Sequence, residues 1–161
     1  MRRIVFMVLA LFAVTVTVGA SAAEKIRIAD TGETTLQMRH GGRSITISIN
    51  TYRRRAALSP DEHDSTAPER PVVERIAITV DKRDVYVPRS VVSALILPRD
   101  AELRMGSPIS VLRIDGGDAS EAYIVRIEFD SQRVRRMTVA SAFIPDKPTQ
   151  VTNYYLRESK N

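Results

Sequence analysis

The stretch from Leu36 to Ile49, LQMRHGGRSITISI, alternates apolar and polar residues on both sides of a glycine pair. Alternation with a period of two is typical of β-strands that bury one face. A two-residue Gly-Gly loop favours a tight hairpin, because both glycines adopt positive φ angles without steric cost. If His40 lies opposite Arg43, then Met38 faces Ile45 and the apolar residues of both strands fall on one face. The turn and the period therefore predict the same hairpin.

The same period recurs along most of the chain and predicts about nine strands in total. Further strands are expected at 25–29, 72–80, 85–87, 103–105, 109–114, 123–129, 134–144 and 151–156. Short connections join most of them, which favours antiparallel neighbours. The expected fold class is all-β, an antiparallel meander that forms a sandwich or a partly closed barrel. The alternation slips near Arg135 and Arg136, which predicts a β-bulge there.

Two segments depart from this alternation. Residues 90–97 carry apolar side chains at helical spacing and end before Pro98, which predicts one short helix capped by Ser90. A short buried strand is the alternative for the same residues. Residues 53–71 show no period and are rich in charged residues and proline, which predicts a long flexible loop.

The N-terminus has the order of a secretory signal peptide. Arg2 and Arg3 precede an apolar run over residues 4–19, and small residues follow. Cleavage is expected to leave Ala23 or Glu24 as the first residue of the mature chain. An uncleaved anchor is the alternative, but the run is shorter than the roughly 20 residues of a membrane-spanning helix. We therefore expect a periplasmic or secreted protein without a stable membrane anchor, folded as a single β-rich domain over residues 24–161.

Composition restricts the chemistry of the mature chain. The sequence contains no cysteine, so no disulfide forms and packing must supply the stability. Removal of the two leader arginines leaves 22 basic against 19 acidic residues, a formal net charge of +3. This mildly basic balance favours an anionic envelope component as partner only weakly. Nucleic acid is not an expected partner, because aromatic and basic residues do not interleave.

Three acidic residues, Asp115, Asp118 and Glu121, stand three apart around a glycine pair. They suggest either a cation-binding loop or the turn of a hairpin. A calcium loop requires six to eight oxygen ligands at prescribed intervals, and this spacing matches no such motif. Strand-like residues flank the segment on both sides, so the chain must reverse there. The turn is the favoured interpretation, and the three carboxylates are retained as candidate binding residues.

Known catalytic and metal-binding patterns are missing from the sequence. It holds two histidines and no cysteine, whereas a catalytic zinc site requires three protein ligands that usually include histidine. It contains neither a Gly-x-Ser-x-Gly elbow nor a Ser-x-x-Lys motif. We therefore expect no metal, no cofactor and no catalytic residue that the sequence identifies.

Basic and aromatic clusters supply the remaining candidate binding residues. Arg53, Arg54 and Arg55 form one basic run, and a second one surrounds the predicted bulge. Such runs meet anionic surfaces, but they also occur on exposed strand ends for solubility and protection of edges. Tyr154 and Tyr155 end the last predicted strand and must point to opposite faces, so one packs inward and the other stays at the surface. A late strand at a sheet edge is open to pairing with a partner strand.

These patterns predict a binding or inhibitor-type protein rather than an enzyme. Its ligand is expected to be a protein or an envelope component, held through loops and an edge strand. The first alternative is an envelope hydrolase, which would need Asp115, Asp118 or Glu121 to line a concave pocket. The second is a carrier of lipid or another small ligand, which would need an apolar cavity inside a barrel. The sequence does not predict the oligomeric state.

Overall fold

The computed structural model describes residues 23–55, 68–93 and 95–155, and the predicted signal peptide lies outside them. Ten strands make up most of the described chain. They are β1 (Ala23–Arg27), β2 (Gly32–His40), β3 (Arg43–Arg55), β4 (Glu69–Val80), β5 (Arg83–Val85), β6 (Pro98–Arg104), β7 (Ser110–Gly116), β8 (Tyr123–Phe129), β9 (Val134–Ser141) and β10 (Pro148–Asn153).

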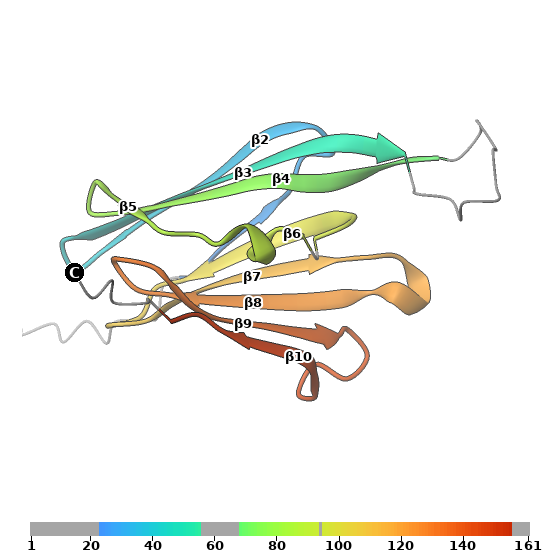
Figure 1. The fold of residues 1–161 in the computed structure, drawn as a ribbon. Coiled ribbons are helices and arrows are strands. Elements are labelled where there is room, and N and C mark those ends of the chain that lie inside the picture. Colours follow the sequence, from blue (N-terminus) through green and yellow to red (C-terminus); the bar gives the residue numbers. More distant parts are fainter. Residues whose placement is uncertain (1–22, 56–67, 94, 156–161) are drawn as a thin grey trace, which may run out of the picture.

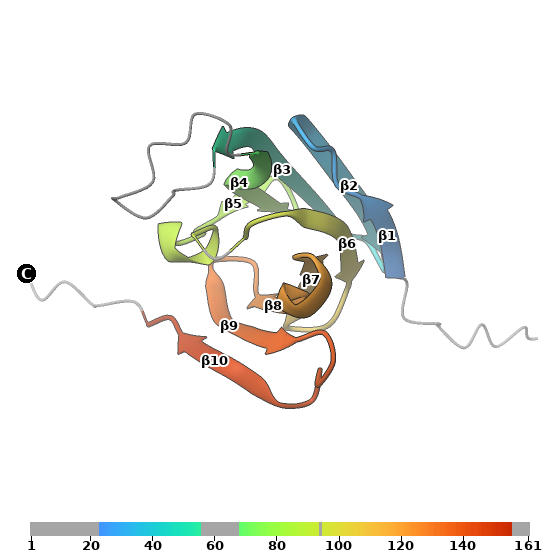
Figure 2. The same cartoon turned by 90° about the vertical axis from the view of Figure 1, so that its right-hand side faces the viewer.

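The strands form two antiparallel sheets that face one another as the layers of a sandwich (Figure 1). The larger sheet has the order β1-β6-β7-β8-β9-β10, and the smaller has the order β2-β3-β4-β5. Neighbours follow one another along the chain, except that β1 pairs with β6. Viewed along the strands, β1 lies beside β2, and β10 lies farthest from the smaller sheet (Figure 2). The all-β sandwich expected from the alternation is confirmed, and the sheets do not close into a barrel.

The hairpin around Gly41 and Gly42 has the predicted register. His40 pairs with Arg43 and Met38 pairs with Ile45. Both glycines have positive φ angles, of 57° and 79°. The apolar side chains of this hairpin consequently all point toward the larger sheet, where they are buried.

The core lies between the two sheets and consists mainly of alternate residues of β2 to β9. Both sheets contribute aliphatic side chains, and Phe129 is the one aromatic side chain that is fully buried among the described residues. This packing explains why the two-residue period predicted the strands well. From the smaller sheet the core receives Leu36, Met38, Ile45, Ile47, Ile49, Ile76, Ile78, Val80 and Val85, and from the larger one Ala101, Leu103, Leu112, Ile114, Val125, Ile127, Phe129, Val134 and Met137.

The predicted β-bulge is present in β9. Glu128 of β8 pairs with Arg136, whereas the next residue, Phe129, pairs with Val134. Arg135 is therefore the additional residue, and it explains why the alternation slips at this position.

The helix predicted over 90–97 is wrong in extent. A 3-10 helix of three residues, Arg89–Val91, is followed by turns, and Ile96 forms an isolated bridge with Val72 of β4. The main chain makes tertiary contacts in place of further helical ones: Val73 N–H donates to Leu95 O at 3.1 Å. Ser90 does not cap the turn through its side chain. Helical spacing over so few residues was outweighed by hydrogen bonds to the edge of the smaller sheet.

The loop predicted over 53–71 is shorter than expected. β3 continues to Arg55 and β4 begins at Glu69, and these two residues pair with one another. Residues 56–67 lie outside the described residues. The charged ends of two long strands lack alternation because both of their faces are exposed to solvent there.

Candidate functional site

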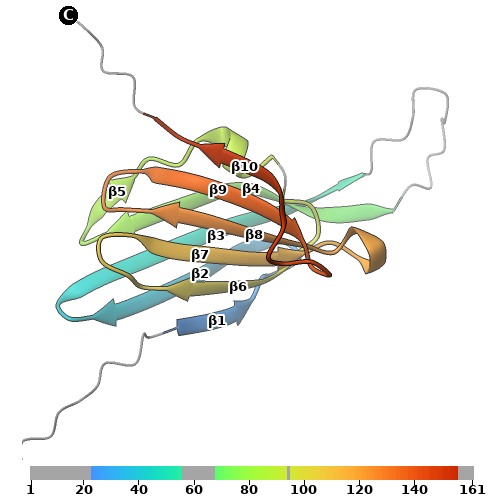
Figure 3. The ribbon, with the colours of Figure 1, turned by 90° about the horizontal axis from the view of Figure 1, so that it is seen from below.

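The outer edge of β10, called here the β10 edge, is the side of residues 148–153 that faces away from β9. Figure 3 shows β10 as the last strand of the larger sheet. Tyr154 N–H donates to Arg135 O at 2.9 Å, so the main-chain groups of Tyr154 point toward β9. Those of Thr152, two residues earlier, point the same way. Because main-chain groups alternate in direction along a strand, those of Val151 and Asn153 point away from β9. No strand of the described residues pairs with them, so the β10 edge offers these donors and acceptors to another strand.

The β10 edge lacks the features that usually protect such edges. Its residues, PTQVTN, include no charged side chain, although Pro148 stands at the beginning. The other edge strands of the two sheets, β1, β2 and β5, each carry both acidic and basic residues. Charged side chains on an edge discourage pairing with other chains. β10 is therefore the described sheet edge that is best suited to accept a partner strand.

Exposed apolar side chains lie on β10 and in the segments that flank it. Val151 is 45% exposed on the strand itself, and Tyr155 is 83% exposed just after it. Phe143 and Ile144 are also exposed, in the loop that precedes β10. Arg126 Nη1 donates to Pro145 O at 3.2 Å, which ties this loop to β8. Large exposed aromatic and aliphatic side chains are typical of surfaces that bind other proteins.

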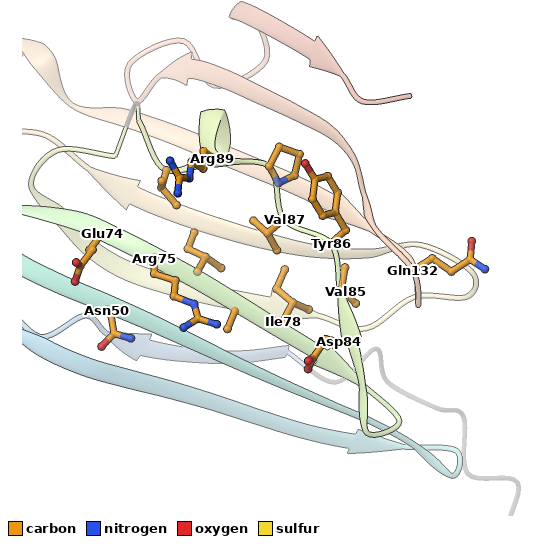
Figure 4. Close-up of a pocket in the computed structure, with 14 residues that line it drawn as sticks. Asn50, Glu74, Arg75, Ile78, Asp84, Val85, Tyr86, Val87, Arg89 and Gln132 are labelled. Carbon is orange, nitrogen blue, oxygen red and sulfur yellow. The ribbon is translucent and has the colours of Figure 1, made fainter. Parts of the chain in front are cut away.

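A second feature is a groove of about 970 Å³ beside β4, called here the β4 groove. One wall is β4 and the other is the segment from Asp84 to Val92, which leaves the smaller sheet after β5 (Figure 4). This groove exists because Tyr86 pairs with the larger sheet. Its N–H donates to Gln132 O, and its carbonyl accepts a hydrogen bond from Val134 N–H. The chain thus leaves β4 one residue after Val85, and the space beside β4 stays open.

The β4 groove is lined by both charged and apolar side chains. Glu74 and Asp84 lie toward its two ends, and Arg75 lies between them (Figure 4). Arg89 projects from the opposite wall, and Val87 points toward the floor. The Asp84 carboxylate accepts a hydrogen bond from the Thr79 hydroxyl at 3.2 Å.

The arginine run predicted as a binding site lies on β3 rather than in a loop. Arg53 pairs with Asp30 through Nη2 and Oδ2 at 2.9 Å, and Arg55 Nε lies 4.0 Å from the Glu69 carboxylate. Arg54 is exposed and stands opposite Arg70. Two of the three charges therefore have acidic partners within the fold, which lowers their availability to an external anion.

The second basic cluster does not form one surface. Arg135 Nε donates to Asp130, and Arg136 is exposed on β9. Arg133 lies next to Tyr86, and two of its buried nitrogens, Nε and Nη1, have no hydrogen-bond partner among the described residues.

The acidic residues predicted around Gly116 and Gly117 lie in and beside the turn between β7 and β8. Asp115 accepts a hydrogen bond from Arg113 Nε at 2.8 Å on β7, while Asp118 and Glu121 are exposed. None of the three lines the β4 groove. Within the described ranges, no three His, Cys, Asp or Glu residues are grouped so that they could hold a metal ion. The turn interpretation agrees with this geometry, because residues 119–121 form a 3-10 turn between β7 and β8.

The two tyrosines differ in burial as predicted, although both lie just beyond the end of β10. Tyr154 packs against the core, and its hydroxyl lies 3.1 Å from the Ser90 hydroxyl. Tyr155 is exposed. Tyr154 thereby ties the end of β10 to the 3-10 turn, and Tyr155 remains available to a ligand.

Sequence reasoning missed the β4 groove. None of its lining residues, among them Arg75 and Arg89, was a candidate, because the groove depends on where the chain changes sheets. The one available signal was Pro88, which predicts that the strand before it ends. In the described part of the chain, no helix is long and apolar enough to cross a membrane.

Comparisons with models of protein families, with curated proteins and with solved structures found no match.

Proposed function

We propose that this chain is an exported, non-enzymatic binding protein that engages a protein partner through the β10 edge. The observation that carries the proposal is an uncharged edge strand whose Val151 and Asn153 main-chain groups point outward. Strand addition to such an edge gives affinity through main-chain hydrogen bonds, and neighbouring side chains give specificity. Val151 and Tyr155 are the exposed apolar side chains best placed to give this specificity.

Export is part of the same proposal. The leader-like N-terminus supports it. Expression of the full chain in a bacterial host tests this step. We expect a mature N-terminus at Ala23 or Glu24 in the periplasm or medium, as read by mass spectrometry. An unprocessed chain that stays in the cytosol would contradict it.

The binding test compares two substitutions at one position. Val151→Pro removes an outward N–H, and proline is tolerated on an edge when its nitrogen faces solvent. Val151→Thr keeps that N–H and serves as the matched control. The mature proteins are immobilised and exposed to periplasmic extract over several salt concentrations. We expect the wild type and Val151→Thr to retain the same partner and Val151→Pro to lose it. Equal retention by all three proteins, or by none, would overturn the proposal.

A further inference from the structure

The β4 groove lies where the smaller sheet lacks part of a strand. The hairpin between β4 and β5 has a two-residue turn, so Val80 and Arg83 form a hydrogen-bonded pair. Main-chain groups alternate in direction from that pair, which points those of Ile78 and Ile76 toward the β5 side. β5 ends at Val85, opposite Ile78. Among the described residues, no strand continues beside Ile76 on this side.

The same edge of β4 is covered again farther along. Val73 N–H donates to Leu95 O at 3.1 Å, and Leu97 N–H donates to Pro71 O at 2.7 Å. The uncovered part therefore comprises residues 74–77, between the covered residues Val73 and Ile78, which lie about 17 Å apart at the rise of a β-strand. A chain segment of about four residues fits between them.

The walls of the β4 groove indicate which side chains such a segment would carry. A residue paired with Ile76 would point its side chain inward, next to Val87 and Val92, and must be apolar. The residue paired with Arg75 would point outward beside the guanidinium. Opposite charges at directly paired positions stabilise antiparallel strands. Neither Arg75 nor Arg89 forms an ion pair with a carboxylate of the described residues, whereas five other arginines do.

We propose that the β4 groove is a second binding site, which takes an extended polypeptide segment with an acidic residue between apolar ones. The segment completes the smaller sheet by hydrogen bonds to the Ile76 main chain and places its carboxylate beside Arg75. This site belongs to the other sheet, so it does not depend on the β10 edge. One protein therefore carries two strand-accepting surfaces, of which the first is uncharged and the second selects acidic partners.

A synthetic peptide, SVTVEVS, is the probe for this proposal, with SVTVKVS as the charge control. Its third to sixth residues lie opposite the uncovered residues 77 to 74, and the residues at its two ends leave the plane of the sheet, because β5 and Leu95 cover β4 there. Binding to the mature chain is measured by chemical-shift changes of the labelled protein during titration. We expect SVTVEVS to perturb Arg75, Ile76 and Ala77 and to bind about fivefold more tightly than SVTVKVS. N-methylation of the fourth residue, which removes the donor opposite Ile76, should weaken binding about tenfold.

Two variants separate recognition from loss of folding. Arg75→Glu should reverse the preference between the two peptides, and Arg70→Glu, on the same strand but outside the groove, should keep it. Val151→Pro should bind SVTVEVS like the wild type, which separates this site from the β10 edge. The proposal is overturned if SVTVEVS produces no saturable change, if the changes map to β10, or if Arg75→Glu leaves the preference unaltered in a folded protein.

Discussion

The Asp130 carboxylate accepts a hydrogen bond from Arg135 Nε at 2.5 Å, across the bulged turn that joins β8 to β9. Its other oxygen accepts hydrogen bonds from the main-chain N–H groups of Gln132 and Arg133, at 2.8 and 2.9 Å. One buried carboxylate thus fixes both the turn and the additional residue of the bulge. The same turn supplies the main-chain groups that hold Tyr86, so Asp130 indirectly keeps the β4 groove open.

Replacement of Asp130 should destabilise the fold. Asp130→Asn removes the ionic character of three hydrogen bonds, and we expect the free energy of unfolding to fall by about 1–3 kcal/mol. Urea denaturation followed by circular dichroism measures the loss. Asp146→Asn, at an exposed position in the loop before β10, is the matched control and should change stability little. A loss no larger than that of the control would contradict the role assigned to Asp130.

The contribution of Asp130 should also depend on pH. Burial raises the pKa of this carboxyl, but hydrogen bonds from the Arg133 and Gln132 main chain and from Arg135 outweigh it and hold the pKa below its usual value of 3.8. The fold therefore favours the ionised carboxylate. Its contribution to the free energy of unfolding is complete above the pKa that Asp130 has in the unfolded chain, and it is lost as the pH falls through the lower pKa of the folded protein. We expect the stability difference between wild type and Asp130→Asn to be constant from pH 7 to about pH 5 and to shrink below about pH 4. A difference that grows on acidification would refute this assignment.

How far the sequence predicts this fold is best seen at its turns. Gly41 and Gly42 determine a register that the structure reproduces, because turn chemistry and side-chain period are both local. The bulge at Arg135 was visible for the same reason. The pairing of β1 with β6 and the departure of the chain at Tyr86 were not, since each depends on main-chain partners far along the sequence. The same contrast between local and long-range features applies to the candidate sites. The late edge strand was expected from the sequence, and the β4 groove was not.

A substitution in the turn between β4 and β5 should stabilise the protein. Asp81 and Lys82 both have positive φ angles, of 50° and 65°, which are unfavourable for residues with a side chain. The Lys82→Gly variant should raise the free energy of unfolding by about 0.5–1 kcal/mol, because glycine adopts this conformation without strain. Lys25→Gly, in the middle of β1, should lower it, because glycine weakens a strand. Thermal denaturation of the two variants distinguishes these effects, and a lower melting temperature for Lys82→Gly would contradict the strain.

The Arg133 side chain should be replaceable without loss of stability. Its Nε and Nη1 atoms are buried without a hydrogen-bond partner among the described residues, and such groups cost free energy on folding. We expect Arg133→Met to leave the free energy of unfolding unchanged or to raise it by up to about 1 kcal/mol. Arg135→Met, which removes the partner of Asp130, should instead lower it. Equal losses of stability in both variants would show that the Arg133 side chain has a stabilising partner.

Gly116 and Tyr123 should show coupled effects on stability. The Tyr123 hydroxyl donates to Ile96 O at 2.9 Å, and burial raises its pKa well above the usual value although nearby Arg99 opposes the shift. A Cβ atom on Gly116 would collide with that hydroxyl and would lie 2.8 Å from Leu97 O. Gly116→Ala should therefore cost about 1–3 kcal/mol, and Tyr123→Phe about 1 kcal/mol from the lost hydrogen bond.

The double variant of these two positions tests their contact directly. A Cβ atom on Gly116 would meet the Tyr123 hydroxyl and would lie 2.5 Å from the ring Cζ, and phenylalanine lacks only the first of these atoms. Because phenylalanine also loses the hydrogen bond to Ile96 O, its ring is free to shift, so Gly116→Ala should cost less in the Tyr123→Phe background than in the wild type. Part of the cost should persist, because the Leu97 carbonyl remains close to the added methyl group. Urea denaturation of the four proteins gives the coupling free energy, which should be at least about 0.5 kcal/mol. Strictly additive losses would show that the Tyr123 hydroxyl takes no part in the collision.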